Sequence, residues 1–282
     1  MSQVQLSDTL REWRESAKYW ETHARTIQKM FAPLTSALIE EAGIIEGDAV
    51  LDVAGGPGEP SLTIAAKVGP AGFVMCTDAV AEMVAAAESE AARRGVKNIQ
   101  FQQCQADSLP FENNSFDAAV SRLGVMFFPD PVAALREMLR VTKKEGTLSF
   151  AVWHESNANP FAYIVTDVVS RHMKTQPADP DAPGAFRFAE PGKLVRVLAE
   201  AGAVHVRERL LKFQIEAPIS REEFWEMRSA TSGTLREKLD ALSSDLRLTI
   251  ANEVKEAVAE YFPNEQMSFP AQMLIVSGDK SN

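Results

Sequence analysis

The chain has 282 residues, of which 45% are hydrophobic and 24% charged, a composition typical of a folded globular protein. Its formal net charge is −10 and no run of Lys or Arg is longer than a pair, which argues against nucleic acid as a substrate. The charged N-terminal residues and the lack of any run of about 18 apolar residues argue against secretion and integral membrane association. Since Cys76 and Cys104 each lie in an apolar run, we expect buried thiols in a reducing, cytoplasmic setting.

Short apolar runs alternate with helical patterns from about residue 34 to residue 153, which predicts βαβ units and a parallel sheet. A helical stretch at 7–31 precedes this region. Strands are predicted at 49–54, 73–78, 99–105, 116–121 and 147–153, with helices near 60–68, 80–95 and 131–142 between them.

The region after the fifth predicted strand does not continue the alternation of strands and helices. The first half of 156–186 has a helical pattern, and the second half is a loop rich in Pro, Asp and Gly. The alternation then resumes with a helix at 191–202, a strand at 204–215, a polar helical segment and a final strand at 273–279. We expect a single domain over 1–282, with an N-terminal helical cap at 1–33 and insertions at 156–186 and 220–262 that act as lids.

Polar features follow three successive predicted strands, where open α/β sheets bind their ligands. The first is the glycine-rich loop from Ala54 to Gly58, whose free N–H groups face a ligand at the start of a helix. Asp78 can accept hydrogen bonds from a ribose diol, and Ala106 with Asp107 can meet an adenine amino group. Taken singly, the loop also fits a tight turn, Asp78 a helix cap, and Asp107 a cap or turn. Together they predict a site for an adenosine-containing ligand.

Four stretches carry a family resemblance: VLDVAGGPGEPSL, TDAVAEMVAAA, CQADSLPFENNSFDAAVSRLGVMFFPDPVAALREMLRV and KKEGTLSFAVW. They resemble successive motifs of class I S-adenosylmethionine-dependent methyltransferases, in the small-molecule branch related to ubiquinone and menaquinone biosynthesis enzymes. The resemblance covers 45–155 well and extends loosely to the terminal strands. It implies an α/β fold with a Rossmann-like, doubly wound, seven-stranded, mostly parallel sheet, whose last strand is antiparallel and inserted between its neighbours.

The resemblance also implies S-adenosyl-L-methionine as cofactor, with S-adenosyl-L-homocysteine as product. It assigns the methionine end to Asp52 and the loop, the ribose to Asp78, and the mouth of the pocket to Ser121 and Arg122. Ala54 replaces the usual first glycine of the loop, which we expect to be harmless if its φ is negative. The complete set of expected cofactor-binding residues is Asp52, Ala54, Gly55, Gly56, Gly58, Asp78, Ala79, Ala106, Asp107, Ser121 and Arg122.

The expected reaction is methyl transfer to a small, apolar or aromatic molecule, because the lid candidates are rich in large apolar side chains. These are Trp13, Tyr19, Trp20, Met126, Phe127, Phe161 and Tyr163, which fit a packed core equally well. One alternative is a nicotinamide-dependent oxidoreductase, although the loop lacks the third glycine of that fingerprint. Another is a non-catalytic protein that binds an adenosyl ligand. No metal is expected, since the four histidines show no ligand spacing. The acceptor, the methylated atom and the oligomeric state stay open.

His154 directly follows the fifth predicted strand and is the candidate catalytic base. If the acceptor loses a proton, an imidazole with a pKa near neutrality is suited to take it. The simpler interpretation is that His154 caps the following loop, in which case Glu155 is the next candidate.

Overall fold

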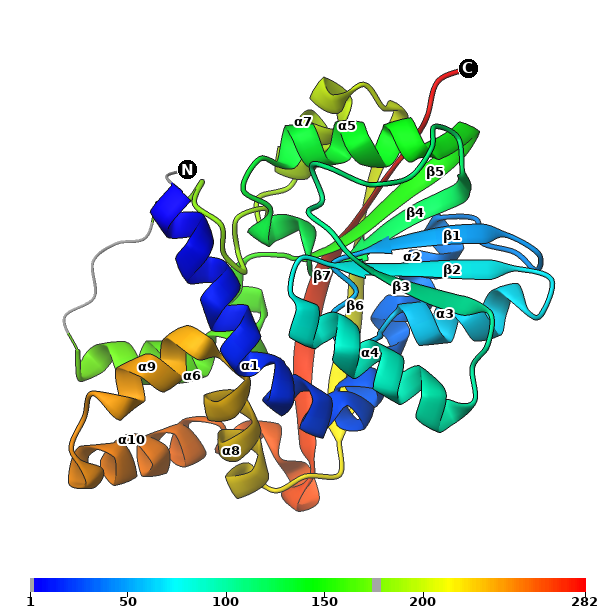
Figure 1. Ribbon diagram of the computed structural model, residues 1–282. Coiled ribbons are helices and arrows are strands. Elements are labelled where there is room, and N and C mark those ends of the chain that lie inside the picture. Colours follow the sequence, from blue (N-terminus) through cyan, green and yellow to red (C-terminus); the bar gives the residue numbers. More distant parts are fainter. Residues whose placement is uncertain (1–2, 174–178) are drawn as a thin grey trace.

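The computed structural model describes residues 3–173 and 179–282, and its centre is one twisted sheet (Figure 1). The sheet has seven strands in the order β3-β2-β1-β4-β5-β7-β6. The last strand of the chain, β7, is antiparallel to both of its neighbours, β5 and β6, whereas β1 to β5 pair in parallel. This arrangement confirms the expected fold. The strands are β1 Ala49–Val53, β2 Phe73–Asp78, β3 Ile99–Gln103, β4 Phe116–Arg122, β5 Thr142–Trp153, β6 Val204–Ala217 and β7 Met267–Asp279.

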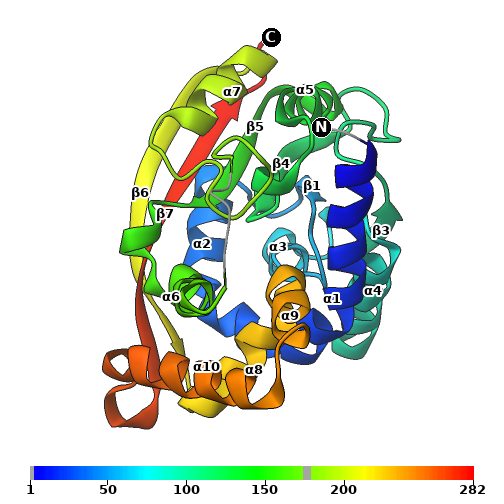
Figure 2. The same ribbon diagram turned by 90° about the vertical axis from the view of Figure 1, so that its left-hand side faces the viewer.

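Helices cover both faces of the sheet (Figures 1 and 2). On one face lie α2 (Ala32–Glu41), α3 (Ser61–Val68) and α4 (Ala81–Arg94), and on the other α5 (Pro131–Val141) packs against α7 (Lys193–Ala201). Several helix ends follow directly from the sequence. Asp130 accepts a hydrogen bond from the backbone N–H of Ala133 at the start of α5, and α7 ends at Gly202 with φ of +110°, as expected for a glycine C-cap.

Five further helices gather at one end of the sheet (Figure 2). They are α1 Gln3–Met30, α6 Pro160–Arg171, α8 Arg221–Thr231, α9 Gly233–Asp240 and α10 Ser244–Ala257. The segment predicted at 220–262 is thus divided into three α-helices, because the Ser232 and Ser243 side chains each cap a new helix start, and a short 3-10 helix (Ala259–Tyr261) follows them. Residues 174–178 of the expected insertion at 156–186 lie outside the described residues. No helix in the described ranges is long and apolar enough to cross a membrane.

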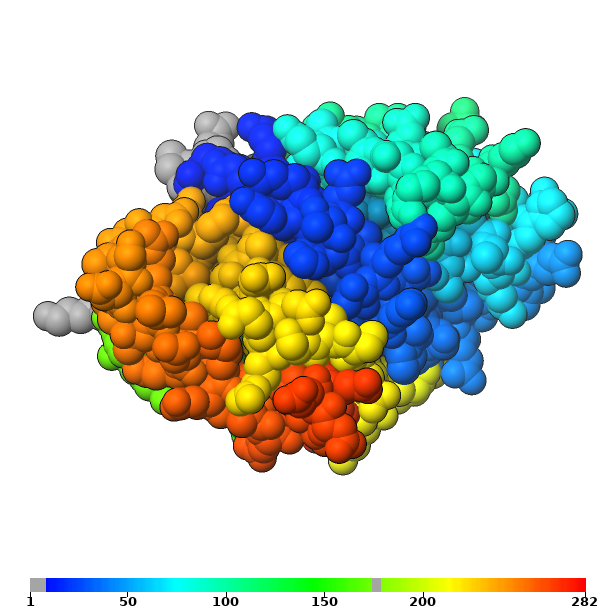
Figure 3. All heavy atoms as spheres, turned by 90° about the horizontal axis from the view of Figure 1, so that it is seen from below, coloured from blue at the N-terminus to red at the C-terminus, as the bar shows by residue number. Residues whose placement is uncertain are grey.

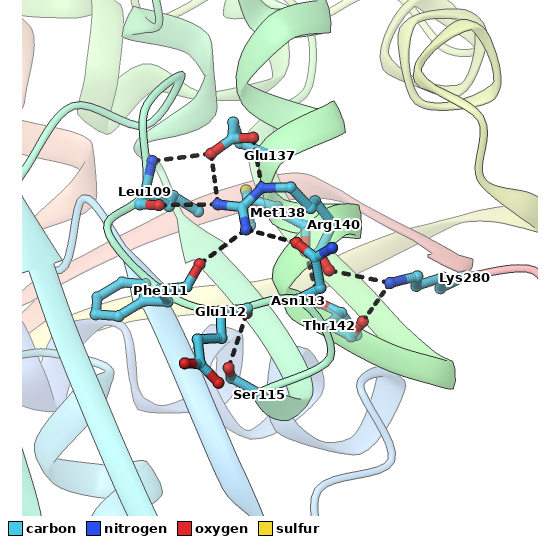
Figure 4. Close-up of polar contacts among 10 residues, drawn as sticks. All are labelled: Leu109, Phe111, Glu112, Asn113, Ser115, Glu137, Met138, Arg140, Thr142 and Lys280. Carbon is cyan, nitrogen blue, oxygen red and sulfur yellow. Dashed lines mark hydrogen bonds and ion pairs between the residues drawn. The ribbon is translucent and has the colours of Figure 1, made fainter.

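The loop between β3 and β4, which begins with the predicted adenine-binding residues, is anchored from α5 (Figure 4). The guanidinium of Arg140 donates hydrogen bonds to the backbone oxygens of Leu109 and Phe111 and to the Asn113 side chain, each 2.8 Å long. Glu137 pairs with Arg140 and accepts a hydrogen bond from the Leu109 N–H. This network fixes the loop soon after it leaves the edge of the sheet.

Candidate functional site

A cavity of about 640 Å³ lies at the carboxyl ends of the strands. Its floor is formed by the loops that follow β1 to β4 and by Trp153 at the end of β5. Helices α1, α6 and α8 supply further walls, together with the start of α9 and the segment 183–185. Eight of the expected cofactor-binding residues line it: Ala54, Gly55, Gly56, Asp78, Ala79, Ala106, Asp107 and Arg122.

The glycine-rich loop leaves β1 through two unusual positions. Ala54 has a φ of +60°, so the condition under which its replacement of glycine is harmless is not met, and an alanine adopts the left-handed conformation that normally favours glycine. Next to it, Gly55 has no room for a side chain. A Cβ atom there would lie 2.7 Å from the Cys76 sulfur and 2.9 Å from Oδ2 of Asp52. The loop therefore lies directly on buried side chains of β1 and β2.

Asp52 supports this loop from below and does not line the cavity. Its side chain is fully buried, and Oδ2 accepts a 2.5 Å hydrogen bond from the Ser61 hydroxyl, while Oδ1 has no protein partner in the described part of the chain. Burial raises the pKa of Asp52 to about 7, although the Ser61 hydrogen bond and the charge of Arg122 oppose this rise. Gly58, the last residue of the loop, has a φ of +109° and likewise does not line the cavity, since it lies close to Leu62.

Asp78, at the end of β2, joins the glycine-rich loop to the next helix. Its Oδ2 accepts a hydrogen bond from the Gly56 N–H at 3.0 Å, and its Oδ1 accepts one from the Val80 N–H at 2.9 Å. Burial raises the pKa of Asp78 to about 6, against the effect of these backbone hydrogen bonds. Because an ionised carboxylate offers about four lone-pair sites, Asp78 keeps capacity to accept hydrogen bonds from a ligand.

Ala106 and Asp107 line the same end of the cavity from the loop after β3. Asp107 is exposed, and its side chain forms no hydrogen bond with the described residues. Its carboxylate is therefore available to a ligand and does not hold the fold, which distinguishes it from Asp130, the α5 cap that also lines the cavity.

We expect Asp107→Ala to lower the affinity for S-adenosylhomocysteine about tenfold, since one hydrogen bond to a charged group is lost. The melting temperature of the free protein should stay within about 3 °C, because exposed substitutions have small effects. Calorimetric titration and thermal unfolding measure the two effects. Asp130→Ala is the matched control and should show the reverse pattern, losing stability with little change in affinity. A large loss of stability in Asp107→Ala would identify this residue as structural.

Two neighbouring residues at the end of β4 are placed differently. Ser121 is fully buried and does not line the cavity, and its hydroxyl has no protein partner in the described ranges. Arg122 does line the cavity, donating hydrogen bonds to the Thr35 hydroxyl at 2.7 Å and the Glu59 backbone oxygen at 3.2 Å. Its Nε is buried without a partner among the described residues. The two hydrogen bonds use two of the five guanidinium N–H groups, so donors remain for a ligand.

The other end of the cavity is aromatic and helical. Trp20 on α1 donates a hydrogen bond from Nε1 to the backbone oxygen of Thr231 on α8, which ties the two walls together. Figure 3 shows α1 in contact with α8 and α9 on one side and with α4 on the other. Of the large side chains expected in the lid, Trp13, Trp20, Met126, Phe127 and Phe161 line the cavity, whereas Tyr19 and Tyr163 do not. Sequence analysis did not identify Met227, Arg228 and Thr231 of α8, which also line it.

His154 is not among the residues that line the cavity. Its backbone N–H donates to the backbone oxygen of Gln272 on β7, and its backbone oxygen accepts a hydrogen bond from the Asn159 side chain. The position of His154 outside the cavity lining gives no support to a role as catalytic base. That role stays a prediction. Within residues 3–173 and 179–282, no group of three His, Cys, Asp or Glu side chains is arranged to hold a metal ion.

A family model described as a methyltransferase domain matches residues 44–202. An uncharacterised protein of Mycobacterium tuberculosis (strain H37Rv) is 40% identical over 131 residues, 46% of this chain and 46% of that protein, so the match spans about half the relative's length. The ubiquinone/menaquinone biosynthesis C-methyltransferase of Hahella chejuensis is 32% identical over 179 residues, 63% of this chain and 69% of that protein.

A solved structure shares the fold. It is an S-adenosylmethionine-dependent methyltransferase from Aquifex aeolicus, which superposes with a TM-score of 0.55 and 16% identity, over 94% of this chain and 98% of that chain.

Proposed function

The chain belongs to the methyltransferase-domain family, and we propose that it transfers a methyl group from S-adenosylmethionine to a small, apolar or aromatic molecule. The observation that carries this proposal is the cavity of about 640 Å³, which joins a polar end at the strand termini to an aromatic end under the helices. Its volume is within the range of small-molecule sites. One cavity can therefore hold a cofactor and an acceptor in contact.

The polar end fits the cofactor group by group. Asp78 accepts hydrogen bonds from the ribose hydroxyls, and Asp107 accepts one from the adenine amino group. The guanidinium of Arg122, a residue that lines this end of the cavity, binds the carboxylate of the methionine end, where a charged donor and the N-terminus of α3 favour an anion. Gly55 and Gly56 let the cofactor approach the backbone.

The aromatic end fits the acceptor. When bound, the cofactor supplies an activated methyl group, and the protein has only to orient the acceptor in line with it and exclude water. Trp20, Trp153 and Phe161 provide flat apolar surface for this purpose and line the cavity together. This wall supports an apolar or aromatic acceptor over a highly polar one.

Titration calorimetry with S-adenosylmethionine and S-adenosylhomocysteine tests the cofactor, and we expect dissociation constants in the low micromolar range or below. Titration with NADH tests the oxidoreductase alternative, for which we expect no binding. Incubation with methyl-labelled cofactor and a panel of small acceptors then separates an enzyme from a non-catalytic binding protein, since only an enzyme gives labelled product. Failure of the wild-type protein to bind either adenosyl compound would refute the proposal.

We further expect α1 to respond to the cofactor alone. Its residues Trp13, Trp20 and Ile27 line the cavity, and Ala17 packs on Val80 and Met83, near the end of β2. Saturation with S-adenosylhomocysteine should slow hydrogen exchange of the α1 backbone. A bound ligand contacts α1 and so makes it less favourable for this helix to move away from the cavity. The measurement is hydrogen exchange by mass spectrometry, with α7, which does not line the cavity, as the internal control. Equal protection of α1 with and without ligand would make it a fixed part of the scaffold.

A further inference from the structure

Three arginines of the described residues line the cavity, and they differ in their counter-charges. Arg94 forms an ion pair with Glu59 at 2.9 Å and a second with Glu90 at 2.5 Å. Burial lowers the pKa of Arg122, and the nearby charges of Glu59 and Asp52 oppose this shift. Arg228 on α8 forms no ion pair within the described residues, and burial is the sole cause that shifts its pKa.

The contacts found for the Arg228 guanidinium among the described residues are one hydrogen bond and one aromatic ring. One terminal N–H group donates a hydrogen bond to the backbone oxygen of Ala162 on α6 at 3.3 Å, and the guanidinium lies 4.9 Å from the ring centre of Phe161. Its Nε is buried without a hydrogen-bond partner in the described part of the chain. A guanidinium has five N–H donors, so most of those on Arg228 are not used by Ala162.

A buried cation without a counter-charge is costly, and cation–π contact with one ring offsets only part of that cost. Burial lowers the pKa of Arg228 to about 10, which still leaves the side chain charged at neutral pH. The cavity therefore keeps a fixed positive charge on its aromatic wall, in contact with Phe161 and on a different element from the groups assigned to the cofactor.

We propose that Arg228 binds a carboxylate group of the methyl acceptor, so that the substrate class is apolar or aromatic carboxylic acids. This inference rests on the proposed function and narrows it. The planar guanidinium matches a carboxylate with two parallel hydrogen bonds, which a neutral acceptor of the same shape cannot replace. Phe161 and Trp153, which stack with an interplanar angle of 22°, then contact the apolar body of the acid.

The test uses two matched probe pairs on protein saturated with S-adenosylhomocysteine: benzoate against benzamide, and 2-naphthoate against 2-naphthamide. Within each pair the shape is kept and the negative charge is removed. We expect the wild type to bind each acid at least tenfold more tightly than its amide, and Arg228→Gln to lose this preference. Arg221→Gln is the control, because it removes a cation from the exposed start of the same helix and should keep the preference.

Each outcome has one interpretation. Equal binding of acid and amide by the wild type, or a preference that survives in Arg228→Gln, overturns the proposal. If Arg228 only connected α8 to α6, the Gln variant would lose thermal stability without an acid-specific loss of affinity. If S-adenosylhomocysteine itself does not bind, the proposed function fails. The probe pairs are then measured on the free protein, so that the acid preference of Arg228 is tested separately. Arg228→Lys, which keeps the charge but loses the planar fork, should retain part of the preference.

Discussion

Gly55→Ala should disable the candidate cofactor site and destabilise the free protein. The added Cβ would lie 2.7 Å from the Cys76 sulfur and 2.9 Å from Oδ2 of Asp52, both of which are almost completely buried. Asp52 is also held by the Ser61 hydroxyl, so it can move only by breaking a buried hydrogen bond. Overpacking plus this loss should cost about 2–4 kcal/mol of unfolding free energy. For a chain of this size the melting temperature should fall by roughly 3–7 °C.

The affinity for S-adenosylhomocysteine should fall at least tenfold in the same variant, because the loop relieves the overlap by moving into the cavity. Gly184→Ala is the matched control. Gly184 also lines the cavity, but a Cβ there meets only the Ala182 backbone oxygen, at 3.8 Å. We expect its stability and affinity to match the wild type in thermal unfolding and calorimetry. Wild-type values in Gly55→Ala would contradict the close packing beneath the loop.

The parallel half of the fold could be predicted from local sequence. Strands β1 and β2 are apolar runs, of which the first ends in a glycine-rich loop and the second in an acid. The helices after them end at glycine. Both the strands and the helix ends are therefore visible in short stretches of sequence. The inserted antiparallel β7 could not be derived from pattern, because pairing across the sheet is not local. It was implied by family resemblance alone.

Other parts of the fold depend on contacts that periodicity does not reveal. Helix α2 was not predicted as an element, since it is largely apolar and lacks a clear polar face. The predicted strands at 147–153 and 273–279 are longer in the structure. Strand β5 begins at Thr142, which pairs with Phe116 of the parallel strand β4 across an irregular register, and β7 begins at Met267, in a stretch that pairs with β6 alone.

In the candidate site, too, some features follow from local sequence and others depend on distant contacts. Sequence position alone brought Asp78, Ala106 and Asp107 to one edge, since carboxyl ends of neighbouring parallel strands meet there. It could not give the positive φ of Ala54, which depends on how the loop packs. Nor could it identify Arg228, because the contact with Phe161 joins residues far apart in the chain.

Asp78→Asn should weaken S-adenosylhomocysteine binding by about 10- to 100-fold. The ribose hydroxyls lose a charged acceptor, and one such hydrogen bond contributes about 1.5–3 kcal/mol. The variant keeps the size of the side chain, but an amide NH₂ group cannot accept a hydrogen bond, so either the Gly56 or the Val80 N–H also loses its partner. We therefore expect a lower stability of the free protein as well, and this alone would not distinguish ligand binding from a structural role.

The pH dependence of binding makes that distinction. Burial raises the pKa of Asp78 to about 6, and hydrogen bonds from a ribose diol require the ionised form. Affinity of the wild type should therefore be nearly constant above about pH 7, fall by about half at pH 6 and fall about tenfold by pH 5. Calorimetry across this range measures the step, which should be missing in Asp78→Asn. A step that persists in the variant would assign it to another group and leave Asp78 with a structural role.

Folding stability should change with pH in the opposite direction. Since the pKa of Asp78 is about 6 in the folded protein and has its ordinary value of 3.8 in the unfolded chain, the native protein binds more protons between these values. This contribution stabilises the free protein at low pH and is lost as the pH rises through 6, by up to about 3 kcal/mol. Asp52, with a pKa of about 7, acts in the same direction in both proteins and cancels in their comparison. Urea unfolding at pH 5 and pH 7.5 should thus show a smaller loss of stability with rising pH in Asp78→Asn than in the wild type, and equal losses would contradict the raised pKa.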